Sequence, residues 1–275
     1  MPGRVLLFAG LFAFYPLLGC GKDLADEITE HKAKVVAKLD QIKQLQQAAK
    51  SAPLVTDDHA IVGGPPPLMP ASEYSISKRS NTAVVYLEDL ERLEELGNVP
   101  FRMDGTGAVN RCASTLTTHR EPYDPVIEKN PPAEVDAYRA RGYFEYCEEL
   151  RYLFVIRSLA FSSPGLVVDV PGACPVENAA DAGADAGAAA DAGAGAGLSC
   201  KRFVGGKLEA EVLVFDIPSQ KQLGGFRFTV DSSRRIDVSL DSEPKLAAGP
   251  DFRVQVRAAF LAKARTSVPS FDIGY

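Results

Sequence analysis

A chain of 275 residues, 46% of them hydrophobic, is long enough for one or two domains with a substantial core. Acidic residues outnumber basic ones by 36 to 30, which gives a formal net charge of −6 at pH 7. This acidic balance argues against nucleic acid and anionic headgroups as electrostatic partners.

The N-terminal segment has the features of an export signal. Arg4 precedes an almost uninterrupted apolar run at 5–18, too short for a transmembrane helix, which needs about 20 apolar residues. A basic start, a short apolar stretch and a small residue before the cleavage site are typical of a secretory signal peptide. The motif at the expected cleavage site, LLGC at 17–20, resembles the lipobox of bacterial lipoproteins. In these proteins lipid is attached to the cysteine, and cleavage makes that cysteine the new N-terminus.

The resemblance implies a lipid-anchored protein of the bacterial cell envelope, at the periplasmic face or in the outer membrane. Residues 1–19 would be the signal peptide and Cys20 would carry the lipid, palmitate included. Pro16 departs slightly from the pattern, because proline interrupts a helical apolar region. Removal of 1–19 takes away only Arg4 among the charged groups and leaves a formal charge of −7. Membrane contact is therefore expected to come from the lipid.

Segment 20–50 is predicted to be the lipidated N-terminus followed by an amphipathic helix at 22–50. The helix would reach about 40 Å and could act as a stalk that self-associates as a coiled coil. The alternative is a helix packed on its own domain, because His31 and Lys32 interrupt the apolar stripe. The residues of that stripe recur at helical spacing: Leu24, Ile28, Val35, Leu39, Ile42, Leu45 and Ala49.

A linker rich in proline and glycine is predicted at 51–81, and the globular domain at 82–275. Near its start, a strand is predicted at 83–87, a stretch that could equally be helical, and a short helix that ends at Gly97 follows it. A second helix is opened by the prolines at 131–132. Its inward candidates are Val135, Tyr138 and Cys147.

Three further elements complete the predicted domain. The run RYLFVIRSLAF, at 151–161, is rich in β-branched and aromatic residues and is predicted to be a central strand. Alternation on both sides of a turn predicts an antiparallel hairpin at 207–233, and a last helix at 250–266 has an apolar face suited to covering the sheet. The fold class is α+β, with a mainly antiparallel sheet covered by helices on one face.

If the protein is exported, its cysteines can form stable disulfides, because such bonds persist outside the cytosol. With Cys20 assigned to lipid, four remain, and sequence alone does not select among their three pairings. We favour Cys112 with Cys147 and Cys174 with Cys200. Their spacings match no zinc motif.

A low-complexity tract at 179–197 contains only Ala, Gly and Asp. It is predicted to be a disordered insertion at 175–199, because its few apolar side chains cannot offset the entropy of ordering it. A calcium loop is disfavoured, since the aspartates are too sparse for the ligand spacing. A bridge between Cys174 and Cys200 would close the insertion at its base.

Candidate catalytic groups are few. Only three histidines exist, and His31 and His59 are interpreted as solvated or packing residues. His119 follows Cys112 by seven residues, so a thiol nucleophile with a histidine base is conceivable, although a disulfide is the stronger interpretation of Cys112. Motifs of serine hydrolases and phosphate-binding loops are absent from the sequence.

Two groups of acidic residues are further candidates for a site. Glu209 and Glu211 share one strand face and fit a solvated side at least as well as acid/base chemistry. The run at 57–59, Asp-Asp-His, could touch a metal but with low specificity. We therefore predict no cofactor, no metal and no catalytic residue.

The sequence favours a noncatalytic, lipid-anchored envelope protein with a binding or structural role and a partner in the envelope. The alternative is an exported, hydrolase-like enzyme with a site assembled around His119.

Overall fold

The computed structural model describes residues 22–55, 68–69, 81–96, 107–123, 132–168, 201–232, 244–268 and 272–273. Its elements, in chain order, are α1 Leu24–Ser51, β1 Leu68–Met69, β2 Thr82–Tyr86, the 3-10 helix η1 Leu87–Leu90, α2 Ala108–Thr118, α3 Ala137–Glu149, β3 Tyr152–Ser162, β4 Gly165–Val168, β5 Lys201–Val204, β6 Lys207–Asp216, β7 Lys221–Asp231, α4 Pro244–Ser267 and β8 Asp272–Ile273.

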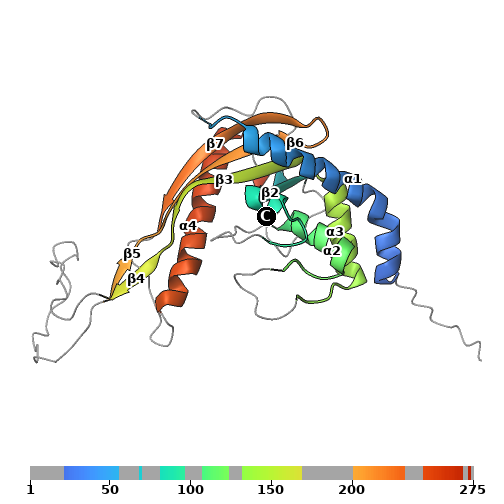
Figure 1. Cartoon of the computed structure of the whole chain (residues 1–275), viewed down its shortest axis with the longest axis horizontal. Helices are drawn as coiled ribbons and strands as arrows, with labels where there is room; N and C mark the ends of the chain where they lie inside the picture. The colour runs from blue at the N-terminus through green and yellow to red at the C-terminus, as the bar shows by residue number, and fades with distance from the viewer. Residues whose placement is uncertain are drawn as a thin grey trace, which may run out of the picture.

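A four-stranded sheet in the order β2-β3-β6-β7 organises the molecule (Figure 1). β3 lies between β2 and β6, so the predicted central strand is confirmed. β2 runs parallel to β3, while β3, β6 and β7 are antiparallel neighbours. The predicted hairpin is the β6-β7 pair, with a turn that includes Pro218 and Ser219. The fold class is α+β, as predicted.

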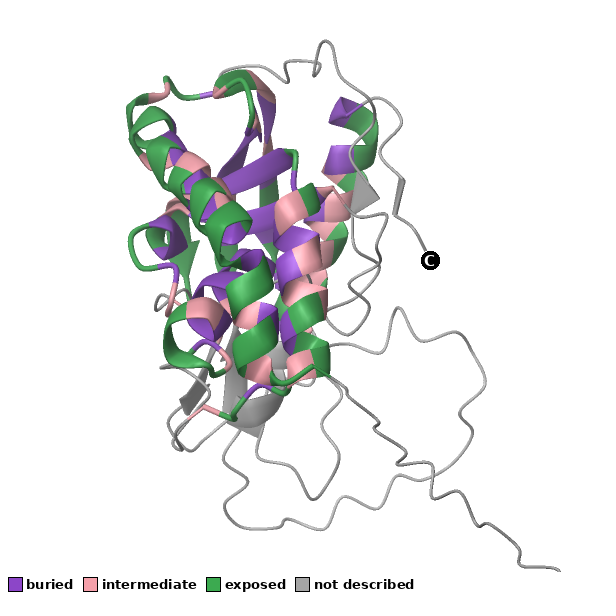
Figure 2. Cartoon of the chain, turned by 90° about the vertical axis from the view of Figure 1, so that its right-hand side faces the viewer, coloured by how far each residue is buried: buried purple, intermediate pink, exposed green. Residues whose placement is uncertain are grey.

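Helices cover both faces of the sheet, which corrects the expectation that they lie on one face. β3 shows why: its first five residues, 152–156, are all buried, so both faces of the strand are apolar and need cover. One face belongs to the core built with α1, α2 and α3, and the other to the core that contains α4. Figure 2 shows buried strands behind helices whose outer sides are exposed.

Helix α1 is part of this fold. Its apolar stripe is buried in the same core as α2, α3 and the sheet, so the packed helix is the correct interpretation and the free stalk is wrong. The heptad positions that a coiled coil would use are buried against other elements of the same chain. The buried apolar residues are Val35, Leu39, Ile42, Leu45 and Ala49.

Helix α3 begins later than the prolines suggested. Its N-cap is Asp136, whose side chain accepts a hydrogen bond from the backbone N–H of Arg139 at 2.8 Å. Val135 and Cys147 are buried as predicted. Tyr138 is 87% exposed, so its inward assignment was wrong.

The short helix predicted to end at Gly97 is wrong. After β2, the residues described up to Leu96 form the 3-10 turn η1 at Leu87–Leu90 and then further turns, and Leu90 and Leu93 are buried in this segment. α4 starts before the predicted 250. Of the side chains predicted to cover the sheet, Phe252, Val256, Phe260 and Ala264 are buried and Ala259 is partly buried.

The low-complexity tract lies between two strands that pair with each other. β4 and β5 are antiparallel, and Val168 is opposite Lys201. The chain therefore leaves and re-enters the fold at one place, as an insertion requires. The tract itself, Gly97 and most of the linker predicted at 51–81, namely 56–67 and 70–80, lie outside the described residues. Within the predicted linker, Ser51 ends α1 and Leu68–Met69 form β1. None of the helices in the described part of the chain is long and apolar enough to cross a membrane.

Candidate functional site

The structure does not bring a cysteine nucleophile to His119. His119 is exposed at the end of α2, where it takes the left-handed conformation with φ 61°. Cys112 is bonded to Cys147, so it has no thiol to be activated. The proposed nucleophile and base pair is therefore not formed.

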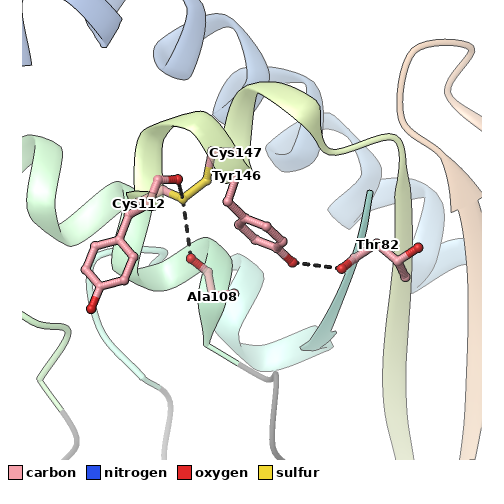
Figure 3. Close-up of a disulfide and its surroundings, with 6 residues drawn as sticks. Thr82, Ala108, Cys112, Tyr146 and Cys147 are labelled. Atoms are coloured by element: carbon pink, nitrogen blue, oxygen red, sulfur yellow. Dashed lines mark hydrogen bonds between the residues drawn. A yellow bond between two sulfur atoms is a disulfide. The ribbon is translucent and has the colours of Figure 1, made fainter. Parts of the chain in front are cut away.

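The disulfide between Cys112 and Cys147 joins α2 to α3 and confirms one of the two favoured pairings (Figure 3). Both cysteines are fully buried, with their Cα atoms 6.5 Å apart. Beside the bridge, the Tyr146 hydroxyl donates to the backbone oxygen of Thr82 at 2.7 Å, which fastens α3 to β2 as well. Cys20, Cys174 and Cys200 and the run at 57–59 lie outside the described residues.

Glu211 is fully buried, which overturns its assignment to a solvated face. It lies opposite Arg157 of β3 and opposite Arg227 of β7, so three charges lie in one row across three strands. Arg157 forms a hydrogen-bonded ion pair with Glu211, and the Nε atom of Arg227 lies 3.9 Å from its other oxygen. Glu209 is partly exposed and takes no part in this row.

The same ion pair holds the C-terminal end of α1. The Arg157 guanidinium donates to the carbonyl oxygens of Ala49 and Ala52, each at 3.0 Å. The backbone N–H of Val55 donates to Glu211 at 2.9 Å. A cation is favourable at this helix end, because the last carbonyls have no partner inside the helix and the dipole is negative there. The row of charges thus fixes α1 to the sheet.

A second polar cluster joins the first half of α1 to α3. Glu27, 1% exposed, accepts hydrogen bonds from the Arg141 guanidinium, which holds the pKa of Glu27 below its ordinary value. His31 is also buried, with Nδ1 2.7 Å from Glu148 and Nε2 3.7 Å from Glu27. Its ring packs on Phe144, with centroids 5.7 Å apart. The packing interpretation of His31 is correct, and the solvated one is wrong.

This cluster contains the one group of metal-type ligands among the described residues. Ligand atoms of Glu27, Glu30 and His31 lie within 4.8 Å of one another. Two of the three already have cationic partners, because Glu27 pairs with Arg141 and Glu30 pairs with Lys22. A divalent ion would have to displace these cations, so the arrangement fits a structural ion-pair cluster better than a metal centre.

Sequence signals for both polar clusters were present but missed. Glu27 and His31 precede Val35 at intervals of four, so the spacing that defines the buried stripe includes them. Glu211 shares its strand face with Leu213 and Phe215, which belong to the core under α1. A face that contains such side chains cannot be wholly solvated.

Replacing Arg141 by methionine tests the first cluster. The variant leaves the buried Glu27 carboxylate without the Arg141 cation, so we expect the free energy of unfolding at pH 7 to fall by more than it does in Arg139→Met, which loses only an exposed pair. Glu27 has a lowered pKa, so its contribution is present above the ordinary glutamate pKa of about 4.3 and is lost as the pH falls through the folded value. The Arg141 variant and the unsubstituted protein should therefore converge in stability at acid pH.

Urea unfolding from pH 7 to pH 3 measures this effect. The control is Arg139→Met, which removes an exposed ion pair with Asp136, 3.6 Å long, and should change stability by about 0.5 kcal/mol or less. A constant difference between the Arg141 variant and the unsubstituted protein at all pH values would contradict the assignment.

Comparison with known proteins adds no assignment to this geometry. The chain matches no protein-family model, no curated protein and no solved structure.

Proposed function

We propose that this chain is a lipid-anchored protein of the bacterial cell envelope with a noncatalytic binding or structural role. The observation that supports it best is the buried bridge between Cys112 and Cys147, because such bonds persist in oxidising compartments and are rare in the cytosol. The bridge agrees with an export signal, and the LLGC motif at 17–20 adds lipid attachment at Cys20. The cell envelope is the compartment that satisfies both features.

The arrangement of polar groups supports a noncatalytic role. Glu211, Glu27 and His31 are buried, yet each is engaged by partners that hold helices to the sheet or to one another. Such groups stabilise packing and leave no reactive atom facing a substrate. His119 is exposed and Cys112 is bonded to Cys147, so the hydrolase-like alternative lacks the thiol nucleophile that it requires. The partner we propose is another envelope component, which crosslinking in intact cells would identify.

Replacing Cys20 by alanine tests the lipid anchor. We expect complete loss of palmitate incorporation and a shift of the protein from the membrane fraction to the soluble fraction, because alanine has no sulfur to accept the lipid. Globomycin, which blocks signal cleavage of lipoproteins, should make the unsubstituted protein accumulate in a larger, uncleaved form.

Labelled palmitate, mobility and fractionation measure these outcomes. The matched control is Gly21→Ala, which keeps the acceptor cysteine and should remain lipidated. Unchanged size and unchanged membrane association in the Cys20 variant would overturn the proposal.

A further inference from the structure

Helices α1 and α3 start at the same end of the molecule. Three contacts advance along both helices together: Glu27 with Arg141, His31 with Glu148, and Lys38 with the carbonyl of Leu150, the C-cap of α3. The two helices are therefore parallel, and their N-terminal turns lie side by side (Figure 1). This end is also where the chain enters the fold.

Tyr138 is the most exposed of the large apolar side chains at this end. It is 87% exposed, while other exposed side chains of this class in the described residues are between 38% and 62%. Tyr138 lies three residues before Arg141, and Arg141 pairs with Glu27, which is three residues after the start of α1. Tyr138 is therefore level with the first residue of α1.

The length of the chain limits how far the proposed lipidation site can lie from this level. Cys20 is four residues before Leu24, and four extended residues span at most about 14 Å. Helix α1 cannot lengthen this tether by swinging free, because its side chains at 27 and 31 are buried against α3. If Cys20 is held at a membrane, the N-terminal ends of α1 and α3 are held there too.

We propose that this end of the molecule, formed by Lys22, Tyr138 and Arg139, is the surface that contacts lipid headgroups. The inference rests on the proposed lipid attachment at Cys20. A tyrosine combines an apolar ring with a polar hydroxyl and suits the boundary between headgroups and acyl chains. Lys22 and Arg139 are exposed at the same end. Their ion pairs with Glu30 and Asp136 are solvent-exposed and therefore weak, so their N–H groups can donate to headgroup phosphates. The lipid on Cys20 would bring this surface to the membrane, so the protein does not need a net positive charge to reach it.

Depth-dependent quenching tests this surface on the full-length, lipidated protein. A fluorophore is attached to Tyr138→Cys or, as the matched control, to Gln47→Cys, an exposed position on α1. Position 47 lies 23 residues beyond Leu24, about 35 Å along α1. The probe is a vesicle of phosphatidylcholine with a small fraction of headgroup-nitroxide lipid, and the protein without added cysteine gives the background.

We expect quenching at 138 to be several-fold stronger than at 47. Inserting a flexible segment of about 20 Gly and Ser residues after Gly21 should reduce the quenching at 138 to the level at 47, since its mean reach is about 25 Å. Equal quenching at both positions, or none at 138, overturns the headgroup surface.

Flotation of the vesicles separates this failure from failure of the anchor. Protein that floats with the vesicles but is not quenched at 138 contradicts only the surface. Protein that does not float contradicts lipid attachment, and the headgroup surface with it.

Discussion

Replacing Glu211 by glutamine is expected to lower the free energy of unfolding by about 3–5 kcal/mol, the cost of breaking a buried ion pair by removing one partner. Glu211 is fully buried, and the Arg157 side chain is 14% exposed, so little water can replace the lost carboxylate. The variant leaves the Arg157 guanidinium inside the fold without its counterion. Urea unfolding followed by circular dichroism measures the loss.

The chain provides a matched control two residues away. Glu209 lies on the same strand but is partly exposed, so Glu209→Gln should change stability by about 0.5 kcal/mol or less. Replacing both members of the pair, Arg157→Met with Glu211→Leu, should recover part of the loss, because an apolar pair of similar volume removes the unpaired charge. Recovery stays incomplete, since Val55 and the end of α1 lose their partners too. Equal effects of the two glutamine variants would contradict the buried pair.

Removing the disulfide should have an effect of similar size. The bridge between Cys112 and Cys147 closes a loop with a sequence separation of 35 residues. In the chain-entropy model, a loop of this length gives a stabilisation of about 4 kcal/mol. The double variant Cys112→Ala/Cys147→Ala should therefore lose about this much, and a further small amount from the cavities where two buried sulfurs were.

Reduction separates the bond from the packing. In a Cys174→Ala/Cys200→Ala background, a reductant acts only on the Cys112 pair and keeps both sulfurs in the core. Unfolding with and without the reductant then measures the bridge alone. A difference below about 1 kcal/mol would mean that the bridge does not constrain the unfolded chain as expected.

Strand pattern predicted the centre of the fold well. The alternation at 207–233 identified β6 and β7 and assigned Phe226 and Phe228 to a core, because side chains of a strand point to opposite faces in turn. The dense apolar run of β3 identified a central strand. The same run also indicates that helices cover both faces of the sheet, because a strand that is buried on both faces requires a layer of helices on each side.

Charged residues caused the main errors. Residue type favours solvent for Glu211 and leaves His31 between solvent and packing, although the spacing of both residues places them on buried faces. Their partners, Arg157 and Glu148, lie 54 and 117 residues away in the chain. No local pattern reports such pairings. The disulfide was favoured correctly, but the sequence left three connectivities open and only the spatial packing of α2 on α3 selects this pair.

The row formed by Arg157, Glu211 and Arg227 also bears on how the chain avoids misfolding. Apolar alternation repeats every two residues, so a slip of two positions between β3 and β6 would keep every apolar side chain on its proper face. That slip would place Glu211 opposite Val155 and separate it from Arg157, its hydrogen-bonded cation, with Arg227 at 3.9 Å as the remaining partner. Such an alternative pairing is costly, because breaking a buried ion pair destabilises the fold that contains it. The three charges therefore discriminate between strand alignments that the apolar residues alone would treat as equivalent.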